Sequence, residues 1–336
     1  MAVGLVSAAW DSAMANDVHG AVNYQRLDSS FGPTPSSFWA VGGQSDALFS
    51  GPYNTNGVSS INATSWANSA LSWYKTNCPA GKSECPSIEV LNEPGGFWFW
   101  GSNGGNQVNA TSYANLVKTA YTTFHVAFGS NSPLVLASAD GSWGTPPNAP
   151  PGTPGYETWI YEWWNQSMSS YLDGIIIHPY GGTNFGNASQ IEQSAQGNRQ
   201  EVSDVHTLTN KPIYITEVGW PTNDAGPSVT NVNATGDSLQ WPQNDSPQNQ
   251  YPGLDQCDNV YNFVSWARSI GYVNAVYIFN ELDGPTPGYG VEAYIANPST
   301  TNTGLGTHKD SYFSLGDASQ NKPNPCPRPS NGYRLQ

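Results

Sequence analysis

The sequence predicts an α/β fold in which parallel strands alternate with helices, specifically a (β/α)₈ barrel. Short apolar, β-branched runs recur along the chain, and stretches with helical periodicity lie between them. The predicted strands are 3–7, 21–27, 45–50, 87–92, 133–138, 174–178, 212–217 and 273–279. A repeated strand–helix alternation is typical of a parallel sheet. Eight strands favour a closed barrel over an open, doubly wound sheet.

Helices are predicted wherever apolar residues recur every 3.6 positions on one face. Three such faces are Trp66, Ala67, Ala70, Trp73 and Tyr74; Tyr113, Leu116, Val117, Ala120 and Phe124; and Val260, Phe263, Val264, Ala267 and Ile270. The segment 281–336 lacks this periodicity, so we expect the last barrel helix to be short or irregular. The segment 221–254 is rich in Pro, Asn, Asp and Gly, and we interpret it as a long loop over the barrel mouth.

A chain of 336 residues without a linker-like stretch fits one catalytic domain, 1–336, with a C-terminal tail of about 281–336. No segment approaches 18 apolar residues, so we expect neither a membrane span nor a membrane partner. The apolar start, Ala2 to Trp10, lacks a basic region and is short for a signal peptide. We interpret it as mature sequence that follows a removed signal.

Charge is sparse and negative. Asp, Glu, Lys and Arg make up 11% of the chain, against roughly 25% in typical soluble domains. The formal net charge of −14 leaves no basic face for phosphate backbones or anionic lipid. Nucleic acid is therefore excluded as a partner, and a neutral substrate fits better.

Four cysteines indicate two disulfides. Cys78 and Cys85 bracket a short turn-rich loop, and Cys257 and Cys326 would tie the tail to a late helix. Four free thiols remain the alternative, whereas zinc is disfavoured because paired short spacings are missing. Six N-x-S/T sequons, at Asn62, Asn109, Asn165, Asn187, Asn233 and Asn244, add weak support for secretion. We expect a secreted, extracellular protein.

Two glutamates stand where a barrel enzyme needs its carboxylates. Glu93 follows the predicted fourth strand, and Glu217 ends the seventh. Catalytic side chains of (β/α)₈ barrels lie at the C-terminal ends of strands. Either glutamate alone would be an ordinary strand-end carboxylate, but both together indicate a two-carboxylate site.

Several motifs resemble those of clan A glycoside hydrolases. Val90-Leu91-Asn92-Glu93-Pro94 resembles the clan's fourth-strand Asn-Glu-Pro motif, and Tyr214–Trp220 resembles the seventh-strand motif that carries the nucleophile. His178-Pro179-Tyr180 is similar to the His-x-Tyr that supports the nucleophile, and Arg26 matches an early-strand arginine. The segment Phe313–Asp317, followed by Lys322-Pro323, is similar to one that often follows the eighth strand. Together these motifs cover most of the chain.

The resemblance implies a retaining β-glycosidase that works by double displacement. Glu93 would be the general acid/base and Glu217 the nucleophile, with the two carboxyl groups about 5–5.5 Å apart. Asn92 would hydrogen-bond the sugar 2-hydroxyl. Arg26 and Tyr180 would keep Glu217 ionised and oriented. His178 would support the site rather than react.

Aromatic side chains in the predicted top-face loops indicate a cleft for a chain-like substrate. They include Trp98, Trp100, Trp143, Trp220 and Trp241. Such rings stack on the C–H faces of sugars, although any one of them could simply pack a loop. The predicted eighth strand ends at Phe279, where many clan members place a tryptophan as a sugar platform.

The sequence leaves the sugar open. Endo action on a glucan- or mannan-type polysaccharide is favoured, with exo action on short oligosaccharides as an alternative. A non-catalytic carbohydrate-binding barrel is a second alternative, although a binding role needs neither glutamate. The chain has no G-x-S-x-G elbow, H-E-x-x-H or nucleotide-binding glycine pattern. We therefore expect no cofactor, no metal and a monomer.

Overall fold

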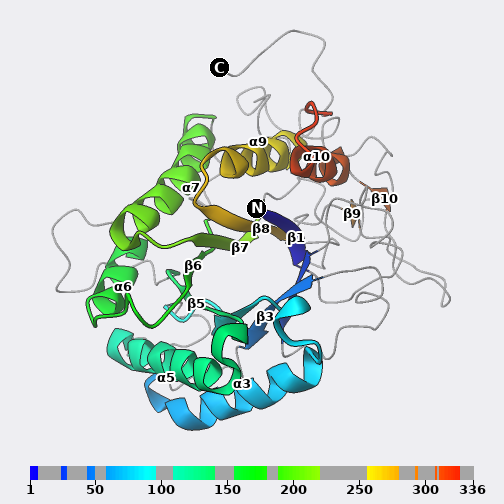
Figure 1. Cartoon of the computed structure of the whole chain (residues 1–336). Helices are drawn as coiled ribbons and strands as arrows, with labels where there is room; N and C mark the ends of the chain where they lie inside the picture. Colours follow the sequence, from blue (N-terminus) through cyan, green and yellow to red (C-terminus); the bar gives the residue numbers. More distant parts are fainter. Residues whose placement is uncertain are drawn as a thin grey trace, which may run out of the picture. The chain divides into compact units, whose positions relative to one another are not determined.

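The computed structural model describes an α/β fold of parallel strands and helices (Figure 1). The described residues are 1–6, 24–28, 44–49, 58–95, 109–140, 155–179, 188–219, 256–279, 292–293, 307–308 and 310–325. The α/β class and the parallel strand arrangement predicted from the sequence are confirmed. The long loop expected at 221–254 lies outside the described residues.

The described chain contains eight successive strands, the later ones alternating with helices along the sequence. They are β1 (Ala2–Val6), β2 (Tyr24–Asp28), β3 (Gln44–Phe49), β4 (Ser87–Val90), β5 (Leu134–Ser138), β6 (Gly174–Ile177), β7 (Ile213–Val218) and β8 (Val273–Phe279). Each predicted strand has its counterpart within a few residues. Strand β4 stops at Val90 instead of residue 92.

The chain divides into two compact units. One unit comprises Gln25–His178 and Gln200–Ile215, and the other comprises Met1–Tyr24, Pro179–Arg199 and Thr216–Gln336. The boundary passes through strands β2 and β7, so each unit holds part of both. The prediction of a single domain stays a prediction.

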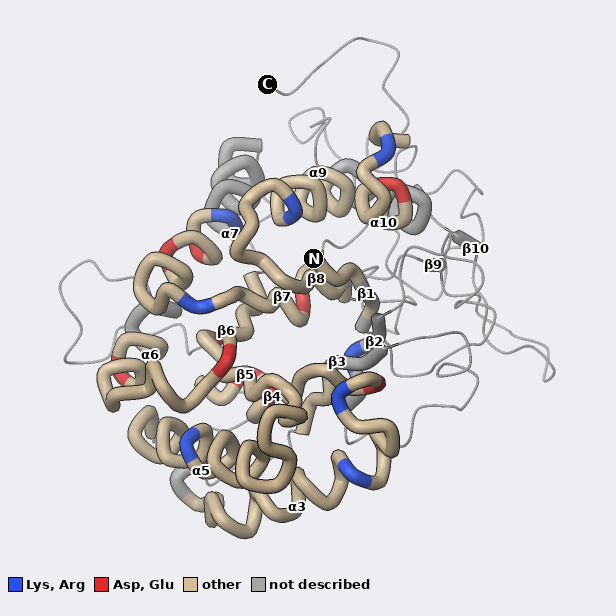
Figure 2. The backbone as a smooth tube through the Cα atoms, viewed as in Figure 1, with Lys and Arg blue, Asp and Glu red and all other residues tan. Residues whose placement is uncertain are grey.

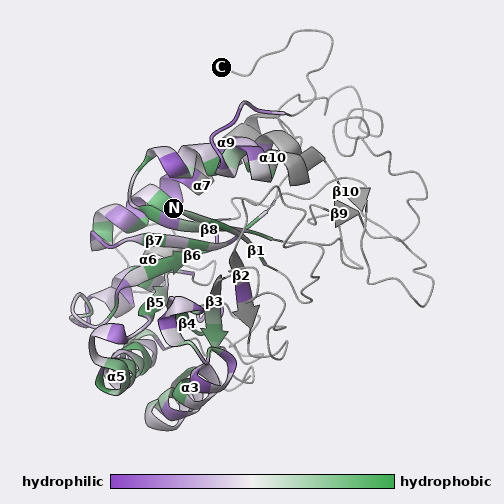
Figure 3. Cartoon of the chain, turned by 45° about the vertical axis from the view of Figure 1, so that its right-hand side comes forward, coloured by the Kyte–Doolittle hydropathy of each residue, from purple (hydrophilic) through white to green (hydrophobic). Residues whose placement is uncertain are grey.

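In the first unit, strands β3 to β7 pair in parallel. The register aligns Phe49 with Val90 and Val90 with Ala137, and it aligns Ile177 with Ile215. All described residues of β4 and β6 are buried, as expected when helices cover a parallel sheet. Strands such as β6 accordingly carry the hydrophobic colour in Figure 3.

Gly174 allows a close approach between β6 and β7. A Cβ atom added at Gly174 would lie 2.5 Å from Cε2 of Tyr214 and 3.1 Å from Cδ2 of Leu136. Real Cβ atoms do not come that close, so any other residue would push the tyrosine ring out of its place. The glycine therefore sets the packing of this part of the sheet.

Helices α3 (Ala63–Asn77) and α5 (Ala110–Phe128) pack against each other over the strands (Figure 1). Each begins at an asparagine whose side-chain oxygen accepts a backbone N–H: Asn62 from Ser65 at 2.9 Å, and Asn109 from Ser112 at 3.0 Å. The predicted apolar faces of both helices are buried, apart from Trp73, which is partly exposed. Helix α6 (Gly155–Trp164) packs beside α5, and α7 (Ala188–Thr209) precedes β7.

The core between α5, α6 and the strands is aromatic. The Tyr113 ring packs against that of Trp159 in a tilted arrangement, with centroids 5.4 Å apart, and meets Trp163 edge-on at 5.7 Å. The Tyr113 hydroxyl donates to the Val90 carbonyl at 3.0 Å and accepts the Ser138 N–H at 2.7 Å. One buried phenol therefore ties helix α5 to the C-terminal ends of β4 and β5.

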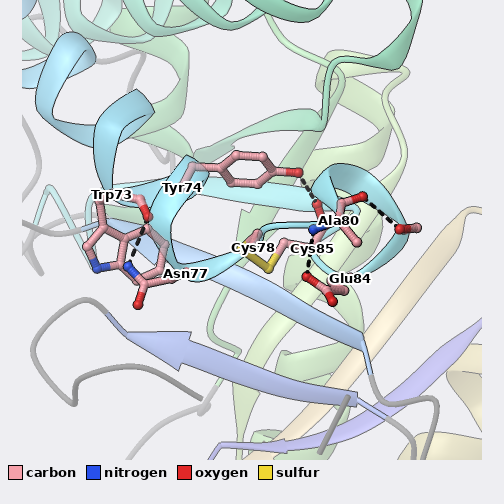
Figure 4. The surroundings of a disulfide bond; sticks show 8 residues. Trp73, Tyr74, Asn77, Cys78, Ala80, Glu84 and Cys85 are labelled. Atoms are coloured by element: carbon pink, nitrogen blue, oxygen red, sulfur yellow. Dashed lines mark hydrogen bonds between the residues drawn. A yellow bond between two sulfur atoms is a disulfide. The ribbon is translucent and has the colours of Figure 1, made fainter. Parts of the chain in front are cut away.

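The predicted disulfide between Cys78 and Cys85 is confirmed (Figure 4). It closes the turn that joins α3 to β4, which contains the short 3₁₀ helix η2 (Gly81–Ser83). The Tyr74 hydroxyl donates to the Cys85 carbonyl at 2.7 Å, and the Glu84 carboxylate accepts the Ala80 N–H at 3.0 Å. The turn is thus held by one covalent bond and by hydrogen bonds on both sides of it.

In the second unit, β1 pairs in parallel with β8, with Ala2 opposite Ala275 and Val6 opposite Phe279. Helix α9 (Gln256–Ser269) packs against α10 (Asp310–Ser319), and β9 (Glu292–Ala293) pairs with β10 (Thr307–His308). The ten-residue α10 confirms that the last helix is short. The Cys257 side chain and Cys326 lie outside the described residues, so the second disulfide stays a prediction.

Charged residues are sparse along the described chain, and most of the tube in Figure 2 is uncharged.

Two further 3₁₀ helices are described: η1 (Val58–Ser60) precedes α3, and η3 (Gly129–Asn131) follows α5. Within the described residues, no helix combines the length and the apolar character that crossing a bilayer requires.

Candidate active site

Glu93 lies in an unusual backbone segment directly after β4. Leu91 and Glu93 both have positive φ angles, 65° and 41°, a region that costs a non-glycine residue on the order of 1–3 kcal/mol. The positive φ of Leu91 ends the strand two residues earlier than the sequence predicts. Leu91 is 1% exposed, so core packing holds the strained segment in place. Backbone strain held by packing is a frequent mark of functional sites.

His178 holds the Glu93 carboxyl group in a defined position. It follows β6, and its Nδ1 lies 2.9 Å from Oε1 of Glu93. The His178 side chain is 2% exposed and that of Glu93 is 15% exposed. The strand-end histidine and the strand-end glutamate therefore form one hydrogen-bonded pair, with the carboxyl group partly open to solvent.

Arg26 forms a buried ion pair with a residue that the sequence analysis did not select. Its Nε and Nη2 donate to the two carboxylate oxygens of Glu89 at 2.8 and 2.7 Å. Both side chains are almost fully buried, at 3% and 0% exposed. This bidentate geometry is the strongest arrangement of an arginine–carboxylate ion pair. The predicted role of Arg26 toward Glu217 stays a prediction.

Asn92 is fixed by the same arginine. Nη2 of Arg26 donates to Oδ1 of Asn92 at 2.9 Å, and Asn92 is buried. Because its oxygen accepts this hydrogen bond, the amide nitrogen of Asn92 is the group that can donate to a ligand. This orientation suits the predicted contact with a sugar hydroxyl, which stays a prediction.

Asp140 is a second carboxylate close to the Glu93–His178 pair. It comes two residues after β5, and its Oδ1 accepts the backbone N–H of His178 at 2.8 Å. Its Oδ2 accepts the Ser138 hydroxyl at 2.9 Å. The pKa of Asp140 is raised to about 6, chiefly by burial; His178 opposes the shift, and the charge of Glu93 adds to it. Asp140 is therefore an acidic residue next to Glu93 and His178 that the sequence analysis did not select.

Glu201, on α7, adds a third acid to this cluster. Burial raises the pKa of Glu201 well above its ordinary value, and the negative charge of Asp140 adds to the shift. His178 has the opposite effect on it. Acids gathered around one histidine, with pKa values shifted upward, are a frequent feature of catalytic sites.

Glu217 occupies the predicted place near the end of β7, and Phe279 is the last residue of β8. Both side chains are partly exposed. On β7, Glu217 shares a strand face with Ile215, because side chains alternate along a strand. Other predicted site residues, Trp98, Trp100, Trp143, Tyr180 and Trp220, lie outside the described residues, as does Trp241.

Three residues of the site were not chosen from the sequence: Glu89, Asp140 and Glu201. A signal existed for Glu89, a charged residue inside the apolar run Ile88–Leu91, since buried charges need partners. Asp140 obeys the strand-end rule that selected Glu93. Glu201 carried no signal, because one acid on a polar helix is ordinary.

The sequence matches no protein-family model and no curated protein. Its fold matches solved structures of enzymes that act on β-linked sugars. At 13–14% identity the likeness establishes a shared fold, and the resemblance to clan A glycoside hydrolases is confirmed at that level.

Three of these structures illustrate the match. An endo-β-1,3-glucanase from Amycolatopsis mediterranei, in complex with laminaripentaose, has a TM-score of 0.51 at 14% identity, covering 94% of this chain and 99% of that one. A fungal β-1,4-galactanase has a TM-score of 0.56 at 13% identity, covering 94% and 98%. A β-1,3-glucanosyltransferase from Rhizomucor miehei, in complex with laminaritriose, has a TM-score of 0.50 at 13% identity, covering 92% and 98%.

Proposed function

We propose that this protein is a secreted retaining glycoside hydrolase that cleaves a β-linked polysaccharide within the chain. Its scaffold would be a closed (β/α)₈ barrel. The observation that carries the proposal is the construction around Glu93. A strained backbone presents this strand-end carboxyl group, and a buried histidine holds it at 2.9 Å. The shared fold with glycan-cleaving enzymes supports the same reading.

In the proposed reaction, Glu217 attacks the anomeric carbon while Glu93 donates a proton to the departing glycosidic oxygen. The bond from the anomeric carbon to that oxygen breaks, and a glycosyl ester of Glu217 forms. Glu93, now ionised, then removes a proton from water. The water attacks the same carbon and releases Glu217, so two inversions give net retention. The Asn92 amide would bind the sugar 2-hydroxyl.

For the substrate we propose β-1,3-glucan first. A glucanase and a glucanosyltransferase with this fold are both seen with laminari-oligosaccharides. β-1,4-Galactan is the second candidate, because a galactanase shares the fold. A polysaccharide panel that also includes mannan and xylan, with product sizing, would decide. Oligosaccharides of mixed length indicate endo action, whereas a single short product indicates exo action. No hydrolysis of any β-glycan would favour the carbohydrate-binding alternative.

The role of Glu93 is tested by substrates that differ in leaving group. Glu93→Gln should slow hydrolysis of poor leaving groups by about 10²–10⁴-fold, the usual contribution of general acid catalysis. Dinitrophenyl glycosides need no proton, so they should still form the glycosyl-enzyme, and azide should then speed its turnover. Equal losses on both substrate types would assign the acid role elsewhere.

The role of Glu217 is tested by trapping. A 2-deoxy-2-fluoro glycoside of the preferred sugar should label Glu217 covalently, because fluorine slows the breakdown of the intermediate. Proton NMR of the first-formed product should show the retained anomer, and Glu217→Ala should abolish turnover. An inverted product, or a label on another carboxylate, would overturn the mechanism.

Secretion and a monomeric state complete the proposal. The Cys78–Cys85 disulfide supports an oxidising compartment, since such bonds are rare where thiols are kept reduced. Detection of the protein in culture medium and size-exclusion chromatography with light scattering test these two points.

A further inference from the structure

His178 stands between two carboxylates, and both lie nearest to the same ring nitrogen. Nδ1 is 2.9 Å from Oε1 of Glu93 and 3.8 Å from Oδ2 of Asp140. The three side chains belong to one compact unit, and all of them come from residues that follow strand ends. The histidine is almost fully buried at 2% exposed, so its protonation state depends on these neighbours rather than on water.

Asp140 is fixed rigidly enough to act on the histidine. Its two carboxylate oxygens accept hydrogen bonds from the backbone of His178 and from the hydroxyl of Ser138. The Ser138 hydroxyl also accepts the N–H of Asp140 at 3.0 Å. The Asp140 carbonyl accepts the Gly95 N–H at 3.0 Å, which anchors the turn that follows Glu93. One aspartate thereby touches the histidine and holds the acid loop.

We propose that Asp140 is a positioning residue that keeps a hydrogen on Nδ1 of His178, so that His178 donates to Oε1 of Glu93. A neutral imidazole carries its hydrogen on one nitrogen, and a nearby negative charge favours the nitrogen that faces it. Both carboxylates are nearest to Nδ1. The inference rests on the proposed role of Glu93 as the acid.

The consequence concerns which oxygen of Glu93 carries the transferable proton. If Oε1 accepts from His178, the acidic hydrogen of Glu93 resides on Oε2. Proton donation to the departing oxygen then uses Oε2, and the histidine hydrogen bond remains in place throughout the reaction. Without Asp140, His178 could place its hydrogen on Nε2 and accept from Glu93 instead. The acid proton would then be directed at the histidine rather than at the substrate.

Other groups also face Asp140, and they define the conditions of the test. Glu93 and His178 lie beside it, Tyr113 of α5 is close enough to interact electrostatically, and Glu201 of α7 does the same. Burial raises the pKa of Asp140 to about 6, so its carboxylate is mainly ionised at pH 7.5. Measurements at that pH therefore test the charged form.

The first experiment reads the histidine directly and needs no substrate. Full-length protein labelled with ¹⁵N-histidine is compared by long-range ¹H–¹⁵N NMR with its Asp140→Asn variant at pH 7.5, and His178→Gln assigns the signal. We expect the Nδ1–H form of His178 in the wild-type protein and a shift toward the Nε2–H form in Asp140→Asn. Asp173→Asn is the matched control. Asp173 accepts the Val135 N–H at 2.8 Å, near the other end of β5, and its loss should leave the His178 signal unchanged.

The second experiment separates positioning from general damage to the enzyme. Asp140→Asn should lower kcat/KM at least tenfold on glycosides with poor leaving groups, and much less on dinitrophenyl glycosides. An Nε2–H histidine in the wild-type protein, or an unchanged signal in Asp140→Asn, would overturn the inference. Equal losses on both substrate types would also overturn the inference, but they would leave the proposed function intact. If the wild-type protein hydrolyses no glycoside, the proposed function fails, and the NMR comparison still decides whether Asp140 sets the histidine tautomer.

Discussion

Two buried regions of the same compact unit are built on opposite principles. The outer layer, formed by α3 and α5, is held by aromatic contacts: Tyr74 meets Phe124 edge-on at 5.6 Å, and Phe124 stacks on Phe128 at 6.1 Å. The inner region holds charges instead, with the Arg26–Glu89 pair beside Asn92 and the Glu93–His178 pair beside Asp140.

This difference between aromatic packing and paired charges separates the sources of stability and activity. Aromatic burial stabilises the fold in proportion to the apolar area removed from water. Burying charges gains little net stability, because desolvation offsets their mutual attraction. The inner charges instead fix the orientation of side chains that a substrate would meet. Substitutions in the outer layer should therefore change stability alone, whereas those in the inner region should change activity as well.

The largest loss of stability is expected in the outer layer. Phe124 is fully buried, and Phe124→Ala should lower the free energy of unfolding by about 3–5 kcal/mol. Turnover per folded molecule should not change. Val126, two residues away and 81% exposed, offers a control, since Val126→Ala should have almost no effect in urea unfolding. Similar losses for the two variants would remove the distinction between layers.

A single substitution in the inner region should cost a similar amount for a different reason. Arg26→Met strands the Glu89 carboxylate without its partner, which costs about 3–5 kcal/mol. Arg26→Met/Glu89→Met removes both charges, so its stability should return close to the wild-type value. Activity should not return, because Asn92 has lost its donor. If the double variant were as unstable as the single one, the ion pair would itself be a major source of stability.

The pH dependence of stability should reveal the cost of burying Asp140. Its pKa is raised from 3.8 to about 6, so the folded protein binds this proton more tightly than the unfolded chain does. The contribution of Asp140 to the free energy of unfolding is therefore largest below about pH 4. It falls as the pH rises to about 6, by about 3 kcal/mol at 1.36 kcal/mol per pKa unit. Urea titrations of the wild-type protein and Asp140→Asn at pH 4 and pH 7 should show this change in their difference. A difference that stays constant would contradict it.

The disulfide should stabilise the outer layer by a smaller amount. The two cysteines are seven residues apart, and closure of so short a loop is worth about 2.5 kcal/mol in the chain-entropy model. Cys78→Ser/Cys85→Ser should therefore lower the free energy of unfolding by that amount, with turnover unchanged. Both proteins are compared without reducing agent, because it would also break the predicted Cys257–Cys326 disulfide. A loss of activity in the double variant would show that the two regions are coupled.

The smallest effect is expected at the start of α3. Asn62→Ala removes the acceptor for the Ser65 N–H and should cost about 1 kcal/mol. Asn62→Asp keeps an oxygen acceptor and adds a negative charge at a helix N-terminus, so it should retain the stability. Thermal unfolding of the three proteins provides the measurement. Equal midpoints for all three would mean that the cap is worth nothing here.

The sequence by itself determined the alternation of strands and helices, the Cys78–Cys85 pair and the strand-end positions of Glu93 and Glu217. These follow from local rules: side-chain periodicity, turn composition and the place where an apolar run stops. The end of β4 was predicted two residues too late, because the positive φ of Leu91 results from its packing and is not typical of leucine.

Only the tertiary structure decided which charged groups meet. Arg26 and Glu89 are 63 residues apart, Glu93 and His178 are 85 apart, and Asp140 and His178 are 38 apart. No local pattern fixes such pairs, because each depends on the register of neighbouring strands and on which face of a strand is buried. A buried charge needs a partner. The sequence shows that such a partner is needed, but only the arrangement of the strands in the sheet determines which residue it is.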